Sequence, residues 1–286
     1  MTKTYDLTTG SLAKHFIRLA VPAAIGMVFS TLYNVVDVFF AGMIGTDAQA
    51  GLAISFQAFF IFVTIGFGLS AAMTALVGNA IGAKKTTDAS IIAAQGIGFS
   101  IVTSVLLIVA ARFIGPHLLA IISTEGAYRT AGEAYFMILI LSLPGFIMGY
   151  GLNGILQAQG DTVSMQYALI GAFFANIGLN PLMMFGIPGI WGGLGFDGIA
   201  AATVISQTGV MVYVGFRLMR SGLLDAKTLN NILPNLALYR QILAQLLPTT
   251  FTMLVMFTAG FIVQFYLKTF GTPAVAAYGV ALRVEQ

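Results

Sequence analysis

Long apolar stretches recur along this chain and are separated by short polar breaks. A membrane-spanning helix needs about 20 predominantly apolar residues, and seven runs of at least this length are present, with an eighth opening at Ala274. We expect the spans at residues 16–44, 52–81, 91–114, 135–156, 163–187, 199–219 and 242–270. The pattern therefore predicts an all-α integral membrane protein with several membrane passes.

Composition agrees with this prediction and excludes several classes of function. The chain is 58% hydrophobic and 8% charged, with a mean hydropathy of +0.92, whereas soluble domains carry about 25% charged residues. The basic residues are scattered rather than clustered, so we expect no nucleic-acid partner. There is no cysteine, which excludes disulfides, cysteine zinc sites and thiol catalysis. His15 and His117 lie near segment ends, where they are poorly placed to act as catalytic acids or bases. We therefore expect that the protein is not an enzyme and that it needs no cofactor.

The distribution of Lys and Arg predicts the orientation in the membrane, because cytoplasmic loops carry the excess of these residues. A cytoplasmic N-terminus places nine of them inside and three outside. The inside set is Lys3, Lys14, Arg18, Lys84, Lys85, Arg217, Arg220, Lys227 and Arg240. The outside set is Arg112, Arg129 and Lys268. We expect a multi-pass protein of the plasma (inner) membrane.

Asp37 is the only charged side chain between Arg18 and Asp47, within the first apolar run. A charge near the bilayer centre costs from about 3 to more than 10 kcal/mol, so such residues usually face a partner, a cavity or a transport pathway. A neutral amide would satisfy a helix contact without this cost. Because burial favours the neutral form of a carboxyl group, proton binding at Asp37 could act as a switch.

Other polar side chains share helix faces within the predicted spans. Asn176 and Asn180 are four residues apart, as are Thr203 and Gln207. Further polar positions are Ser30, Asn34, Asn153 and Gln157. They could simply form interhelical hydrogen bonds, worth about 0.6–2 kcal/mol each. Alternatively, two amides and a hydroxyl beside Asp37 could bind sodium through oxygen atoms.

Pro181 follows Asn180 directly and is expected to disfavour helical geometry there. Met183, shortly after it, could line an adaptable apolar pocket. Arg283, inside the eighth span, could form an ion pair with Glu285 or belong to a pathway; the sequence leaves both readings open.

The C-terminal part of the chain can be laid over the N-terminus at an offset of 226 residues. This offset pairs Pro22 with Pro248 and Gly45 with Gly271. Internal repeats are common in secondary transporters. We therefore expect an N-terminal six-helix lobe at 1–220, a cytoplasmic linker at 221–239 and the start of a second lobe at 240–286. A complete pair of lobes would need about 450 residues, so we expect the C-terminal lobe to be truncated here.

Several motifs resemble the multidrug and toxic compound extrusion (MATE) transporters, nearest to the branch of DNA-damage-inducible protein F. They lie at residues 34–42, 78–83, 157–162, 176–181 and 198–203. The resemblance implies a two-lobe, six-plus-six-helix antiporter that exports cationic or amphipathic compounds against proton or sodium entry. It also implies that Asp37 is the cation-coupling acid of the N-terminal lobe, with Asn176 and Thr203 around it.

Two departures from the family pattern are visible. That branch often carries a second Asp where this chain has Asn180, and the sodium-coupled branch often carries a Glu in the seventh helix, where residues 249–267 contain no acid. Asp37 is thus the only acid of the expected cluster. The sequence does not choose between proton and sodium.

The resulting hypothesis is that Asp37, Asn176, Asn180 and Thr203 couple cation binding to export. Substrate would pass along Asn34, Asn153, Met183 and Gln207, while Pro22 and Pro181 allow helix bending. Alternatives are a flippase for lipid-linked sugars and a passive channel. We expect a monomer whose partners are small molecules and the lipid bilayer.

Overall fold

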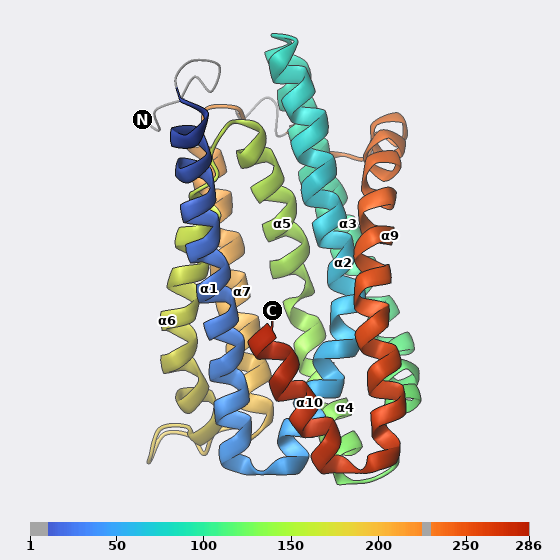
Figure 1. The fold of residues 1–286 in the computed structure, drawn as a ribbon. Helices are drawn as coiled ribbons and strands as arrows, with labels where there is room; N and C mark the ends of the chain where they lie inside the picture. Colours follow the sequence, from blue (N-terminus) through green and yellow to red (C-terminus); the bar gives the residue numbers. More distant parts are fainter. Residues whose placement is uncertain (1–10, 225–229, 286) are drawn as a thin grey trace.

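The computed structural model describes residues 11–224 and 230–285, and this part of the chain is almost entirely helical (Figure 1). The helices are α1 (Leu12–Ile44), α2 (Thr46–Gly82), α3 (Thr86–Ile122), α4 (Ala127–Leu139), α5 (Leu143–Ala158), α6 (Ser164–Phe185), α7 (Asp197–Met219), α9 (Leu236–Leu267) and α10 (Thr272–Glu285). Short 3₁₀ turns are η1 (Ile140–Ser142), η2 (Asn230–Ile232) and η3 (Lys268–Phe270).

Seven segments of the described residues are long and apolar enough to cross a membrane, as the sequence predicted. The fourth is a composite, in which α4, η1 and α5 form one span. Both α2 and α3 contain 37 residues, which gives a length of about 55 Å at 1.5 Å per residue. The predicted runs for these two helices are shorter, because hydropathy marks only the lipid-facing part and the helix continues into the polar interface.

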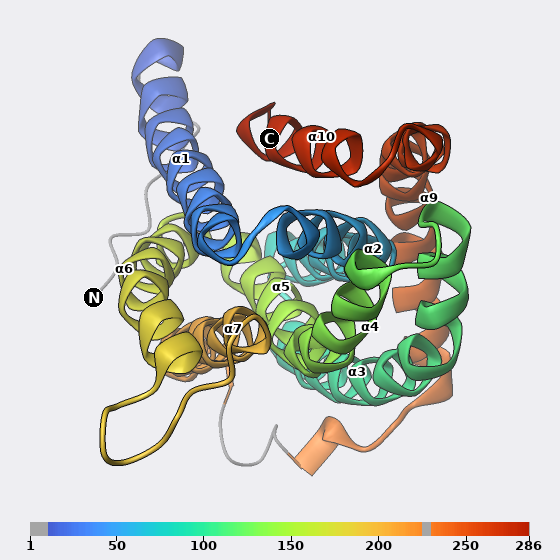
Figure 2. The ribbon, with the colours of Figure 1, turned by 90° about the horizontal axis from the view of Figure 1, so that it is seen from below.

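The bundle is organised around α2, which contacts α3, α4, α5, α9 and α10. Helix α6 packs between α1 and α7. Seen from below, α10 lies on the same side of α2 as α1 and is directed towards it (Figure 2). Phe59, Tyr135 and Leu139 are fully buried in one core cluster, whereas Leu106 and Phe113 on α3 are 63% and 70% exposed. Large apolar side chains on the outside are typical of a surface that faces lipid.

The predicted repeat has a counterpart in the helix boundaries. Pro22 lies inside α1 and Pro248 inside α9. A glycine with positive φ ends each segment, at 145° for Gly45 directly after α1 and at 90° for Gly271 after the 3₁₀ turn η3. The next helices, α2 and α10, begin one residue later, so all three features recur at the offset of 226. The lobe boundaries themselves remain a prediction, and part of the expected linker lies outside the described residues.

Pro181 does not interrupt its helix, contrary to expectation. Helix α6 continues through Pro181 to Phe185, and Asn180 is helical. The preference of a residue before proline for extended geometry is only a bias, and here the packing of α6 against α1 and α7 outweighs it.

Asp161 ties the loop between α5 and α6 to α7. Its Oδ1 accepts hydrogen bonds from the backbone N–H groups of Val163 at 3.2 Å and Ser164 at 3.0 Å. Its Oδ2 accepts from the Ser164 hydroxyl at 2.6 Å and forms an ion pair with Arg217 at 3.2 Å. Partial burial raises the pKa of this carboxyl, but the hydrogen bonds from Ser164 and Val163 and the charge of Arg217 outweigh it and lower the pKa below its usual value.

Replacing Asp161 by Asn is therefore expected to lower the free energy of unfolding in detergent by about 1–2 kcal/mol at pH 7. Because the folded-state pKa is lowered, the stabilisation is present above the unfolded pKa of about 3.9 and is lost as the pH falls further. Thermal unfolding of the two proteins between pH 7 and pH 3 checks this. Asp88→Asn, at an exposed position in the first turn of α3, is the control, and an Asp161 variant as stable as this control would contradict the prediction.

Candidate functional site

The Asp37 carboxylate is fully buried in a polar cluster formed by α1, α6 and α7. Asn180 Nδ2 donates to Asp37 Oδ1 at 2.9 Å, and Thr203 Oγ1 donates to Oδ2 at 3.4 Å. Asn180 Nδ2 also donates to Asn176 Oδ1 at 3.0 Å. The structure thus brings the four predicted cation-coupling residues together. Their role in coupling remains a prediction.

The spacing of four residues explains how α6 builds its half of the cluster. Asn176 and Asn180 lie one helical turn apart on the same face, so one amide can orient the other. With both of its N–H groups engaged, Asn180 presents Oδ1 as a buried oxygen with no hydrogen-bond partner among the described residues. Buried polar atoms usually have a partner in the protein or in ordered water. This oxygen is therefore suited to bind a small cation beside the carboxylate.

Two buried tyrosines belong to the cluster and were not found from the sequence. Tyr33 lies one turn before Asp37 on α1, and its hydroxyl is close to Thr203. Tyr135 on α4 is fully buried in the neighbourhood of Asp37 and Arg283. The spacing of Tyr33 from Asp37 was a usable signal, because residues four apart share a helix face. No local signal marks Tyr135, since only tertiary packing brings α4 to this place.

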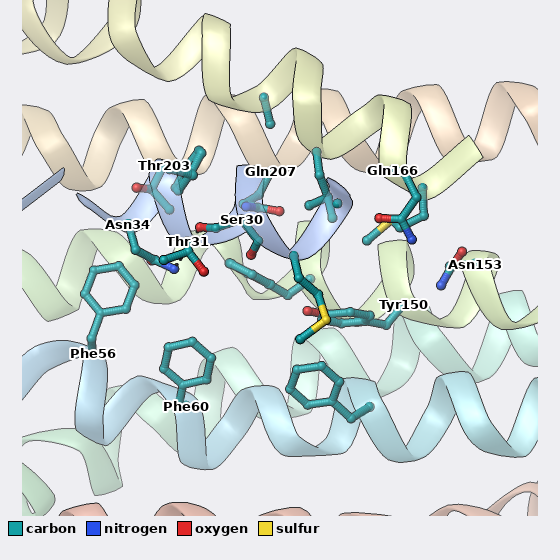
Figure 3. A pocket seen from close by; sticks show the side chains of 18 of the residues that line it. Ser30, Thr31, Asn34, Phe56, Phe60, Tyr150, Asn153, Gln166, Thr203 and Gln207 are labelled. Carbon is teal, nitrogen blue, oxygen red and sulfur yellow. Dashed lines mark hydrogen bonds between the residues drawn. The ribbon is translucent and has the colours of Figure 1, made fainter. Parts of the chain in front are cut away.

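A cavity of about 390 Å³ begins beside the cluster. Asn34 and Thr203 lie at one end of it, and Asn153 and Gln166 lie at the other (Figure 3). Asn153 is near the end of α5 and Gln166 near the start of α6, so the cavity extends towards the side of the bundle where α1 begins. This is the side that the distribution of Lys and Arg predicts to be cytoplasmic.

Aromatic side chains form much of the cavity wall. Phe56 and Phe60 project from α2, and Tyr150 from α5 (Figure 3). Further rings come from Phe67, Phe146 and Phe257. The faces of such rings attract organic cations, by about 0.5–2 kcal/mol per contact. The described residues that line the cavity include neither Lys nor Arg.

Three of the four predicted pathway residues, namely Asn34, Asn153 and Gln207, line this cavity, but Met183 does not. Because α6 continues straight through Pro181, Met183 lies beyond Asn180, on the opposite side of the cluster from the cavity. Its backbone carbonyl accepts a hydrogen bond from Leu194 at 2.8 Å in the turn before α7. Asp37 itself is not a lining residue, so a ligand in the cavity reaches Asn34 and Thr203 first.

Comparison with known proteins identifies the family. The MatE family model matches residues 22–182, which is more than half of the chain. The chain belongs to the MatE family. The resemblance inferred from the motifs is thereby confirmed.

Several relatives match almost the whole chain. The multidrug export protein MepA of Staphylococcus saprophyticus is 20% identical over 285 residues, covering 99% of this chain and 62% of MepA. The probable multidrug resistance protein YoeA of Bacillus subtilis is 27% identical over 274 residues, covering 92% of this chain and 58% of YoeA. This MatE-family chain therefore spans about three fifths of the length of these relatives.

Solved structures show the same fold. An outward-facing multidrug resistance MATE family transporter of the MOP superfamily matches with a TM-score of 0.81 and 25% identity, covering 99% of this chain and 63% of its own. An inward-facing MATE family transporter matches with a TM-score of 0.77 and 22% identity, covering 93% and 61%. The predicted fold class, an all-α membrane protein with the helical fold of the MATE transporters, is confirmed.

Proposed function

We propose that this chain contributes the cation-coupling lobe of an antiporter that exports cationic or amphipathic compounds by alternating access. The observation that carries the proposal is the buried Asp37 carboxylate, held by Asn180 and Thr203 at the end of an aromatic-lined cavity. The cavity offers ring faces for the apolar body of a ligand, and Asp37 supplies the negative charge. The relatives named as multidrug exporters support this assignment.

Coupling follows from competition for one negative charge. When Asp37 is ionised, its field attracts an organic cation along the cavity towards Asn34 and Thr203. When Asp37 takes up a proton, or a sodium ion bound by Asp37 oxygens and Asn180 Oδ1, the negative charge is neutralised and the organic cation is released. Entry of the small cation on one side and release of the substrate on the other give antiport. Among the described residues, no three Asp, Glu, His or Cys side chains are placed so that they could hold a metal ion together, and a single acid favours a monovalent ion.

The prolines give this exchange a mechanical consequence. Pro22 and Pro181 lie inside α1 and α6, the helices that carry Asp37 and Asn180. A proline inside a helix removes one backbone hydrogen bond, which lowers the cost of bending there. We place both as hinges that respond when the cluster changes its occupant. The protein acts as a transporter rather than an enzyme, in the plasma membrane, as a monomer with its N-terminus in the cytoplasm.

A flippase for lipid-linked sugars is the alternative within the same architecture. Such a substrate carries phosphate groups, which proteins bind with Arg and Lys. The 390 Å³ cavity has amide, hydroxyl and aromatic groups on its described walls instead. This lining favours an organic cation over a phosphate headgroup.

The deciding experiment is dye transport in proteoliposomes with proton and sodium gradients imposed separately. Ethidium should move against its own gradient when one of the two ion gradients is present, and this movement should stop when an ionophore dissipates that gradient. Ethidium that merely equilibrates, with or without a gradient, would indicate a channel. Transport of a lipid-linked sugar without transport of ethidium would indicate the flippase.

A further inference from the structure

Arg283 is a buried cation beside the candidate site that the proposed function does not use. It lies on α10, which passes next to α1 (Figure 2), and is only 5% exposed. Its Nη1 donates to the backbone carbonyl of Asn34 at 3.2 Å. Its guanidinium carbon is 3.9 Å from the centre of the Phe56 ring. The remaining terminal nitrogen, Nη2, has no hydrogen-bond partner among the described residues.

Among the described residues, few groups compensate the buried charge of Arg283. A buried charge is costly unless it is paired and hydrogen-bonded, yet no described carboxylate lies within ion-pair distance of this guanidinium. Of the acids whose side chains the structure describes, Asp37 acts on it electrostatically. Arg283 is therefore held by a carbonyl oxygen, an aromatic face and the field of Asp37. A transported organic cation would use contacts of the same three kinds.

These contacts are made with the walls of the substrate cavity itself. Asn34 and Phe56 line the 390 Å³ cavity. Both also line a second cavity of about 20 Å³, which Arg283 borders directly. The arginine thus reaches the wall of the binding space from the side of α10, near the Asp37 end.

The internal repeat shows that this bridge does not require a charge. At the offset of 226, Arg283 corresponds to Gln57 on α2. Gln57 Nε2 donates to the backbone carbonyl of Phe257 on α9 at 3.0 Å. A neutral amide therefore bridges α2 to α9, as Arg283 bridges α10 to α1. The positive charge at position 283 is an addition that helix packing does not explain.

We propose that Arg283 is a tethered competitor of the transported cation, occupying the Phe56 face and the field of Asp37 until the substrate displaces it. This inference rests on the proposed function, because it concerns the same cavity. The positive charge of Arg283 sets the substrate class. Aromatic cations with one charge are accepted, and those with two charges are disfavoured. Displacement also breaks the contact from α10 to α1, which links substrate entry to a rearrangement between the repeats.

Two dyes with the same ring system test the inference. Ethidium carries one positive charge and propidium carries two, and both fluoresce on binding. For the purified protein we expect propidium to bind more weakly than ethidium. In Arg283→Gln, which copies the donor found at position 57, ethidium should bind about tenfold more tightly and propidium should gain more, because one repulsive charge has been removed. Arg283→Lys retains the charge and should keep the wild-type order of affinities.

Arg220→Gln is the matched control. The Arg220 guanidinium also lies over a ring, at 4.3 Å from the centre of Phe216, but it is exposed at the end of α7. Its loss should leave both affinities unchanged. If the wild-type protein binds the dyes but Arg283→Gln binds them equally or more weakly, the inference is overturned and the proposed function stands. If the wild-type protein binds neither dye, both are overturned. Should Arg283→Gln fail to fold, wild-type affinity for propidium equal to or above that for ethidium would by itself overturn the inference.

Discussion

Asp37→Asn is expected to abolish gradient-driven export while leaving the helical bundle folded. The substitution keeps the size of the side chain. Asn180 can still donate to the remaining carbonyl oxygen, and the new amide N–H can donate to the Thr203 hydroxyl. Removing a buried charge removes its desolvation cost, but it also removes the field of Asp37 that acts on Arg283, so these two effects oppose each other in the free energy of unfolding. What disappears is the negative charge and the ability to exchange one cation for another.

The measurement is the rate of ethidium transport in proteoliposomes under an imposed proton or sodium gradient. We expect the rate for Asp37→Asn to fall to that of protein-free vesicles, since the ion and the organic cation no longer compete for one negative charge. Asp47→Asn, an exposed carboxylate in the first turn of α2, is the matched control and should transport normally. Unchanged transport by Asp37→Asn at normal expression would rule out Asp37 as the coupling acid.

The spans and the core of the cluster could be predicted because they follow from local rules. Long apolar runs can only be satisfied as helices in lipid, and an isolated acid among them is too costly to be incidental. Asn176 and Asn180 were visible through their spacing of four residues. Each of these inferences requires only that an apolar run forms a helix and that residues four apart share a helix face. None requires knowledge of how the helices pack.

The rest of the site depends on tertiary packing, which no local pattern encodes. Tyr135 and Arg283 reach Asp37 from helices that lie about 100 and 250 residues further along the chain. Met183 does not line the cavity, and a part in the substrate pathway remains a prediction for it. The aromatic wall was hidden for another reason, since phenylalanines that face a cavity and those that face lipid look alike in a membrane protein sequence.

Gly154 is a position where a single methyl group should harm the packing of two spanning helices. It lies where α5 crosses α2, and a Cβ atom added there would be 2.3 Å from the backbone oxygen of Ser70. Thr74 Oγ1 hydrogen-bonds the carbonyls of both Ser70 and Gly154, at 2.8 and 3.2 Å. Backbone atoms cannot yield as a flexible side chain does, so Gly154→Ala forces the helices apart. We expect it to lower the free energy of unfolding by about 1–3 kcal/mol.

Gly149 on the same helix provides the control, because a Cβ atom there would meet nothing within 4 Å. Gly149→Ala should raise stability by about 0.5–1 kcal/mol through helix propensity alone, so the two substitutions are expected to have opposite signs. Thermal unfolding of both variants in detergent measures this directly, and a melting temperature for Gly154→Ala at or above wild type would contradict the packing.

The consequence for function follows from the same geometry. Because Phe56 and Phe60 stand on α2 and Tyr150 stands on α5, separating these helices moves two walls of the cavity, and ethidium affinity should fall in Gly154→Ala but not in Gly149→Ala.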